Sequence, residues 1–393
     1  MRVIIMKEIT MKKFTMLFTA VFLLSGFIFG QEKVTPGITL TGYGKVVVLP
    51  LIKAGDEDAQ TGIGTTWKDA PHTAVTIEGK STNVGFKIDL AARAKPGSPP
   101  NNAPISYSPK EFSFGTNDFA EVYITPFNWL RLDVGKFNSD VFRGKVADSY
   151  WGNFVGKTGN EDYIFTRIKS GILDDDYYGS LLSLTPVEGL TIGGYINFGR
   201  TDNYGITGFG TAADAYSENI QIAAGYQIKD IGLVRAQYVG KGEILKSAWL
   251  PFNGQRIEAA FALTAVKDWT FDLGIKIPFG DEKTYDFAGS VGVNGRINKI
   301  ALLARIDSRF AEDSKSLDVF LEPGYNLSFG TVNLPIDLDL DFENSDNTNF
   351  GLGLGIKKRF SNGAVGVAFT VRELINNDSG PTIAIPVALE YWF

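Results

Sequence analysis

Apolar and polar side chains alternate along most of this chain. Between Trp269 and Ile277 the odd positions hold Trp, Phe, Leu and Ile, and the even positions hold Thr, Asp, Gly and Lys. The pattern recurs over 84–91, 332–342 and 365–372. A period of two is that of a β-strand with one apolar face. Such segments run for about 9–13 residues, the length that a tilted strand needs to cross a bilayer, whereas strands of soluble proteins average about 5–6.

The connections between these segments have two lengths. Short connections with Asn-Gly or Pro turns occur at 125–128, 185–189, 294–296 and 361–363. Long polar connections span 51–71, 94–115, 138–178, 200–216 and 241–253. Short turns at one end and long loops at the other are typical of outer-membrane barrels. We therefore predict an all-β fold, a transmembrane antiparallel β-barrel.

The number of strands follows from the same pattern. About eighteen segments alternate, and sixteen remains an alternative because 72–80 alternates weakly. The number must be even if both ends of the barrel lie at the short-turn side, so 161–169 is assigned to the 138–178 connection. Three prolines fall inside predicted strands, where each requires a bulge or a missing hydrogen bond: Pro323, Pro335 and Pro386. A barrel of 16–18 strands leaves a water-filled channel.

The first thirty residues have the composition of a secretory signal peptide. Lys12 and Lys13 precede an apolar run over 14–29, and a polar segment begins at Gln31. The alternative is an N-terminal membrane anchor, for which the run is shorter than the ~20 residues that a spanning helix needs. We predict a signal peptide over 1–30 and the barrel over 31–393, and leave the start codon and the cleavage point open.

The C-terminus is an alternating segment that ends on aromatic residues. Large apolar side chains occupy every second position over 383–393, and the chain stops at Phe393. An exposed ending of this kind would be adhesive on a soluble protein. The segment resembles the C-terminal signal of bacterial outer-membrane barrel proteins. The resemblance implies that Tyr391 and Phe393 form an assembly signal and that the barrel-assembly machinery is a partner.

The composition excludes several classes of function. The chain has no cysteine, which removes disulfides, thiol chemistry and thioether lipid anchors. The net charge is -6, and residues 31–393 hold 34 basic and 43 acidic residues, a net charge of -9 that argues against a nucleic-acid partner. His72 is the single histidine, and no His/Cys metal cluster, phosphate loop or GxSxG motif accompanies it. We predict neither an enzyme nor a cofactor.

The strand positions opposite the apolar face carry many charges. Such a face is either the solvated outside of a soluble sandwich or the wet inside of a pore, and the strand lengths and the apolar ending favour the pore. The predicted pore-lining residues are Lys87, Asp89, Arg93, Arg131, Asp133, Asp272, Lys276, Arg305, Asp307, Arg309, Asp337, Asp339 and Asp341. The same parity includes Lys45, Glu121, Arg235, Arg256, Glu258, Asp318, Glu322, Lys357 and Arg372.

Two features bear on selectivity. Asp337, Asp339 and Asp341 share a face and would attract cations if unpaired. Internal pairing with Arg305 and Arg309 is the alternative. The second feature is the long connection 138–178, which is either a surface loop or a loop folded into the lumen; in the latter case its charges set a constriction, and the candidates are Arg143, Lys145 and Asp148.

Over residues 31–393 the chain resembles the porin-like outer-membrane proteins of diderm bacteria. The segment GKFNSDVFRGKVAD over 135–148 is also similar to spirochaetal porin-like barrels. The resemblance implies a bacterial outer-membrane location in contact with lipid, and passive diffusion of small polar solutes and ions through a monomer or a homotrimer. The alternatives are a surface adhesin that binds through loops 51–71, 94–115 and 200–216, and a ligand-specific transporter.

Overall fold

The computed structural model describes residues 37–53, 60–64, 72–96, 109–136, 145–146, 149, 151–155, 179–197, 220–240, 255–280, 285–311, 314–343, 348–372, 374–375 and 381–393. This part of the chain is almost entirely β-structure, with one short 3₁₀ helix, η2 (Gly152–Phe154). No described helix is long and apolar enough to cross a membrane. The predicted all-β class is confirmed.

The strands are long and follow one another closely. In chain order they are β1 (Gly37–Lys53), β2 (Gln60–Gly64), β3 (His72–Lys80), β4 (Val84–Pro96), β5 (Pro109–Phe127), β6 (Leu130–Lys136), β7 (Gly179–Leu184), β8 (Leu190–Asn197), β9 (Ile220–Ile228), β10 (Gly232–Val239), β11 (Gln255–Leu263), β12 (Trp269–Phe279), β13 (Phe287–Ile297), β14 (Ile300–Ala311), β15 (Ser314–Leu327), β16 (Gly330–Asn333), β17 (Ile336–Asp341), β18 (Asn349–Phe360), β19 (Gly363–Arg372), β20 (Thr382–Ala384) and β21 (Val387–Trp392).

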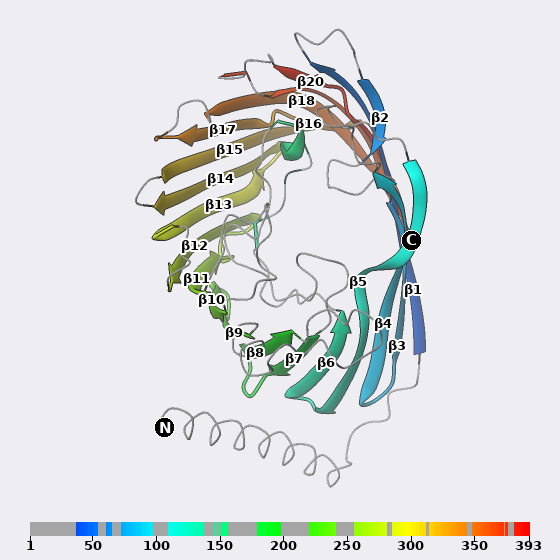
Figure 1. The fold of residues 1–393 in the computed structure, drawn as a ribbon, viewed down its shortest axis with the longest axis vertical. Helices are drawn as coiled ribbons and strands as arrows, with labels where there is room; N and C mark the ends of the chain where they lie inside the picture. Colours follow the sequence, from blue (N-terminus) through cyan, green and yellow to red (C-terminus); the bar gives the residue numbers. More distant parts are fainter. Residues whose placement is uncertain are drawn as a thin grey trace.

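These strands form one closed antiparallel barrel (Figure 1). β1 pairs with β3 on one side and with β20 and β21 on the other, so the first and last wall strands are neighbours. Tyr43 lies opposite Trp392 and Val48 opposite Val387 in this closing pair. Closure removes the free sheet edges that would otherwise pair with other chains.

Eighteen strands make up the wall in the described part of the chain. β16 and β17 are two halves of one wall strand between β15 and β18, and β20 and β21 are two halves of the last one, between β19 and β1. β2 pairs with the second half of β1, over Val47–Leu51, and adds no member to the ring. The larger of the two predicted strand numbers is therefore correct.

Two of the three strand prolines interrupt the wall. Pro335 separates β16 from β17, and Pro386 separates β20 from β21, because a proline has no N–H for the ladder. Their carbonyls still accept hydrogen bonds, from Gly353 N at 2.8 Å and from Ala368 N at 3.0 Å. Pro323 lies within an uninterrupted β15. The predicted continuous strands 330–342 and 381–393 are thus each broken at a proline.

Some strands are longer than predicted. β4 and β5 continue as a paired ribbon as far as Lys95 and Glu111, so β5 begins at Pro109 and not at residue 116. The predicted loop 51–71 is also shorter, because β1 extends to Lys53 and the loop contains β2. Alternation in these extensions is confined to short stretches such as Phe112-Ser113-Phe114, which the prediction assigned to the long polar connections.

The two faces of the wall have opposite polarity. In β12 the side chains of Leu273 and Ile277 are 50% and 46% exposed, whereas Asp272 and Lys276 between them are 0% and 1% exposed. A soluble sandwich would bury the apolar set and expose the charged set. The outer face of this barrel is instead a band of exposed hydrocarbon, which suits lipid and not water.

The C-terminal residue fastens the barrel seam. Gly42 and Phe393 exchange two backbone hydrogen bonds, each 3.0 Å long. A Cβ on Gly42 would lie 2.0 Å from the Phe393 ring, so only glycine leaves room for the ring at this point. Trp392 adds a bond from its indole Nε1 to the Ser361 carbonyl at 3.2 Å. The seam therefore depends on the last two residues.

Candidate functional site

Buried charges line the inner face of β10 to β12. Arg235 forms an ion pair with Asp272, and neither side chain is exposed. On β11, Arg256 Nε donates to Glu258 Oε1 at 2.6 Å, and the amide of Gln237 donates to the same carboxylate. These positions are adjacent in the β10–β11–β12 ladder. The result is two neighbouring groups of paired charges, as buried charges require.

A second charged group lies on β5 and β6. Arg131 bonds to Asp133, 2.7 Å from Nε to Oδ1, and reaches Glu121 Oε1 at 3.5 Å. The guanidinium carbon of Arg131 also lies 3.8 Å from the ring centroid of Tyr123, a cation–π contact. On the neighbouring strands, Asp89 is buried and accepts from Thr76 Oγ1 at 2.9 Å.

Carboxylates form a row across three neighbouring wall strands. Asp307 on β14 lies opposite Asp318 on β15, and Asp318 lies opposite Asp339 on β17. Ser290 on β13 begins the row and donates to Asp307. Asn349 on β18 ends it. Like charges directly opposite one another are destabilising, so the row places mutually repelling carboxylates side by side on the inner wall.

A segment of the 138–178 connection, described at residues 145, 146, 149 and 151–155 and called segment 145–155 below, makes two hydrogen bonds to the inner wall. Lys145 N donates to Asp272 Oδ2 on β12 at 2.7 Å. Ser149 Oγ donates to Glu322 on β15 and accepts from Gly152 N at 2.7 Å. Figure 1 shows η2, in the same segment, inside the ring of strands. The described part of this connection therefore lies within the barrel.

The two ends of the segment are attached at one level of the wall. A single cross-strand row runs from Asp272 through Gly292, Arg305, Phe320 and Asp337 to Gly351. Lys145 bonds to the first member, and the Val155 carbonyl lies so close to the last that a Cβ on Gly351 would be 1.8 Å from it. Five strand spacings of ~4.8 Å separate these ends. The segment thus spans about a quarter of the wall.

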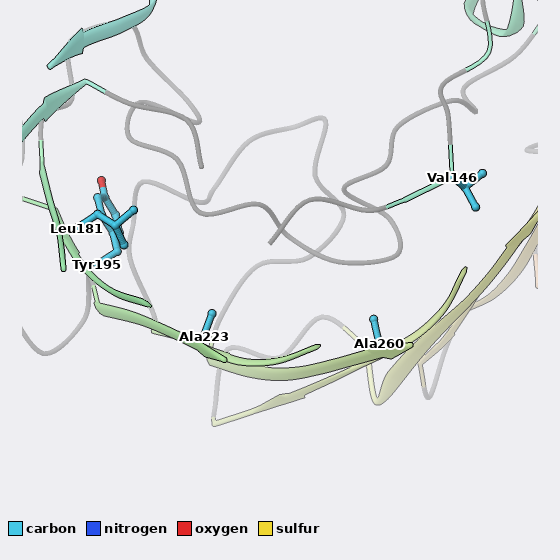
Figure 2. Packing of buried hydrophobic residues seen from close by; sticks show 5 residues of the cluster. All are labelled: Val146, Leu181, Tyr195, Ala223 and Ala260. Carbon is cyan, nitrogen blue, oxygen red and sulfur yellow. The ribbon is translucent and has the colours of Figure 1, made fainter. Parts of the chain in front are cut away.

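Val146 and Trp151, which belong to the same segment, pack on different parts of the inner wall. Val146 belongs to an apolar cluster with Leu181 and Tyr195 on β7 and β8, Ala223 on β9 and Ala260 on β11. Figure 2 shows Ala223 and Ala260 pointing from the wall towards the interior, where the segment that carries Val146 lies. Small alanine side chains on the wall leave room for the backbone of the segment.

Trp151 docks against a wall of very small residues. The inward positions of β18 to β21 include Gly355, Gly366, Ala368, Ala384 and Ala388, and Trp151 is fully buried on them together with Phe154. A Cβ on Gly355 or Gly366 would lie 2.4 Å or 2.9 Å from the indole. The sequence prediction did not identify this contact. The available signal was the run of Gly and Ala at inward positions that carry charges elsewhere.

The predicted site residues fall into three groups. Described residues on the inner wall are Lys87, Asp89, Arg131, Asp133, Asp272, Lys276, Arg305, Asp307, Arg309, Asp337, Asp339 and Asp341. Tyr391 and Phe393 lie on the outer face, 56% and 59% exposed. The Arg93 side chain and the residues Arg143 and Asp148 lie outside the described part, and Lys145 contacts the wall through its backbone.

No metal centre is evident in the described residues, none of which form a group of three or more His, Cys, Asp or Glu side chains able to hold an ion. The row of aspartates agrees with this result, because each of its members comes from a different strand.

Comparisons with known proteins identify the fold. No protein-family model and no curated protein matches the chain. Solved structures do: a tryptophan-substituted mutant of the Rh. blastica porin (TM-score 0.50, 14% identity) and a multiple alanine mutant of the same porin (TM-score 0.50, 13% identity), each covering 91% of this chain and 100% of its own. Salmonella typhi OmpF in complex with daunomycin is also found, with TM-score 0.49, 13% identity, and coverage of 92% and 100%. At this level of identity the likeness establishes a porin-type barrel fold.

Proposed function

We propose that this porin-fold barrel is a bacterial outer-membrane channel for the passive diffusion of small polar solutes and ions. The observation that carries the proposal is the reversed polarity of the wall, with exposed hydrocarbon outside and buried charge inside. Hydrocarbon outside requires lipid, and charge inside requires water or polar solutes. The pore-lining residues predicted from the sequence are accordingly proposed as the lining of this channel.

The segment 145–155 is proposed as the constriction of the channel. Its attachments to Asp272 and Glu322 hold it against the charged side of the wall, and Trp151 holds it against the small-residue side. A solute passing this level meets the segment on one side and the remaining inner wall, including Arg131 and Asp133, on the other. Arg143, Lys145 and Asp148 remain candidates for charges at this constriction.

The remaining parts of the proposal concern delivery and assembly. Residues 1–30 are proposed as a cleaved signal peptide, and Tyr391 and Phe393 as the signal read by the barrel-assembly machinery. The surrounding lipid is a partner through the outer apolar band. A homotrimer and a monomer are both compatible with this function. An enzymatic role is not proposed, because no group of residues in the described part forms a catalytic site.

The experiment that tests this function is recording from the purified protein in planar bilayers. We expect stepwise insertions with ohmic conductance at moderate voltage. Gel mobility before and after boiling serves as the control for folding, because a closed ladder resists detergent until heated. Heat-modifiable protein without any conductance would refute the channel and favour the adhesin, in which the loops carry the function.

A further inference from the structure

Arg305 on β14 presents a buried guanidinium without hydrogen-bond partners. Its side chain is 2% exposed, and neither Nε, Nη1 nor Nη2 has a hydrogen-bond partner in the part of the chain that the structure describes. A desolvated charge is strongly unfavourable unless it is paired. The planar guanidinium offers a fork of donors that matches a carboxylate. Arg305 is thus a fork of hydrogen-bond donors for which the described residues supply no acceptor in bonding position.

The carboxylates one step further along the same face lack donors. Asp307 is two residues beyond Arg305 on β14, and Asp318 lies opposite it on β15. Oδ2 of Asp307 and Oδ1 of Asp318 have no hydrogen-bond partner among the described residues. The other oxygen of Asp307, which is 7% exposed, accepts from Ser290. Each of these two aspartates therefore has one carboxylate oxygen without a donor among the described residues, and the guanidinium of Arg305 does not bond to either oxygen.

The loop segment covers this part of the wall. Arg305 and Phe320 lie in the middle of the cross-strand row whose ends are held by Lys145 and Val155. Phe320 is 1% exposed, beside Arg305. A ligand that contacts Arg305 would therefore lie between the two attachment points of this segment.

We propose that β14, β15 and β17 carry a binding site for a small zwitterionic solute, such as an α-amino acid, that bears one carboxylate and one ammonium group. Arg305 binds the carboxylate, and Asp307, Asp318 and Asp339 bind the ammonium. The site rests on the proposed channel function and gives it a preferred class of solute.

The neighbouring charges decide among ligand classes. A phosphate would also suit the guanidinium, but its two negative charges would face the aspartate row at close range. A bare cation would suit the row but would leave Arg305 unpaired. An ammonium group has three donors that separate acceptors on different strands can share. Only a solute with both charges satisfies both sets of groups.

The test is isothermal titration calorimetry on the purified, heat-modifiable protein in detergent. The probe is glycine, compared with glycolate, which lacks the ammonium, and with ethanolamine, which lacks the carboxylate. We expect glycine to bind at least tenfold more tightly than either. Arg305→Met and Asp318→Asn should each weaken glycine binding at least tenfold. The matched control is Arg296→Met, an exposed arginine on β13 that should leave glycine binding unchanged.

Equal binding of glycine and glycolate, no glycine binding by the wild-type protein, or unchanged binding by Arg305→Met would each overturn the site. If Arg305→Met does not give folded protein, Arg305→Lys keeps the charge without the fork and should still weaken binding. Conductance is measured on the same preparation. Conductance without glycine binding refutes the site alone, and glycine binding without conductance refutes the channel alone.

Discussion

At the scale of single residues, the direction of each side chain decides its environment. Adjacent residues of β12 differ from almost half exposed to fully buried. The exposed member is apolar and the buried one is charged, the reverse of the arrangement in a water-soluble protein. Substitutions one position apart should therefore have very different effects.

Leu273→Arg and Thr270→Arg test this difference. Leu273 is 50% exposed on the outer face, where an arginine in lipid is unfavourable by ~2–4 kcal/mol near the bilayer midplane. Thr270 has the inward parity, where the same charge meets water and polar groups. We expect a large loss of folding free energy only for Leu273→Arg, measured by urea titration in lipid vesicles. Equal losses would mean that the alternation does not separate lipid from lumen.

Trp151→Ala tests the attachment of the loop segment. Truncation of a fully buried tryptophan removes its packing on Gly355 and Gly366, a loss of ~3–5 kcal/mol in well-packed cores. We expect a larger and noisier single-channel conductance, because the segment loses one of its anchors. Gly355→Leu should also give a larger and noisier conductance, because the leucine side chain would collide with the Trp151 indole. The control is Trp129→Ala at the outer rim, where 47% exposure predicts no change in conductance.

At the scale of elements, closure of the barrel depends on the pairing of the first and last wall strands. β1 depends on β20 and β21 for one of its two ladders. The seam is reinforced at its end by the reciprocal bonds between Gly42 and Phe393. A small change there should affect the whole barrel.

Gly42→Val is expected to prevent the seam from closing. The added side chain would begin 2.0 Å from the Phe393 ring, so the ring has to leave its position. Replacing Tyr391 and Phe393 with Ser should reduce assembly as well, by removing the predicted signal. The readout is the fraction of heat-modifiable protein in membranes. The control, Gly194→Val, introduces the same side chain at a position with nothing within 4 Å, and normal assembly of Gly42→Val would refute the role of the seam.

The sequence predicted the elements far better than their contacts. The alternation located all eighteen wall strands because each has one apolar face. Of the three prolines expected to disturb strands, Pro335 and Pro386 coincide with breaks and Pro323 does not. Contacts across the lumen could not be predicted in this way. Trp151 meets Gly355 some two hundred residues later in the chain, and no local period encodes that pairing. The unpaired state of Arg305 was also missed, because the sequence shows that carboxylates are near but not where the guanidinium points.

At the scale of the whole molecule, the inner wall has two unlike sides. Strands β4 to β6, β10 to β12, β14, β15 and β17 carry buried inward charges, whereas the part of β18 to β21 around Trp151 is lined by glycine and alanine. The segment 145–155 bridges the two. The ionic field of the channel is therefore asymmetric around its circumference, with the aspartate row as its most negative part.

The proposed channel is expected to prefer cations weakly. Asp337, Asp339 and Asp341 contribute negative charge to the inner wall, and such carboxylates concentrate cations in a narrow aqueous path. Replacing all three with Asn should shift the reversal potential in a salt gradient towards anions. The shift should shrink at high salt, because screening shortens to about 3 Å at 1 M. A wild-type channel that already prefers anions would contradict the role of these aspartates.

The seam between β1 and β21 also fixes the order of events in biogenesis. β1 is the first wall strand, and its partner β21 follows all the other wall strands in the chain. The two backbone hydrogen bonds at Gly42 require Phe393. Until β21 has been made, β1 keeps an open hydrogen-bonding edge, which is a template for wrong partners. The β1–β21 pair therefore forms only after every other wall strand has been made, and the open edge of β1 needs protection until then. Removal of Phe393 would leave the seam without the two backbone hydrogen bonds at Gly42.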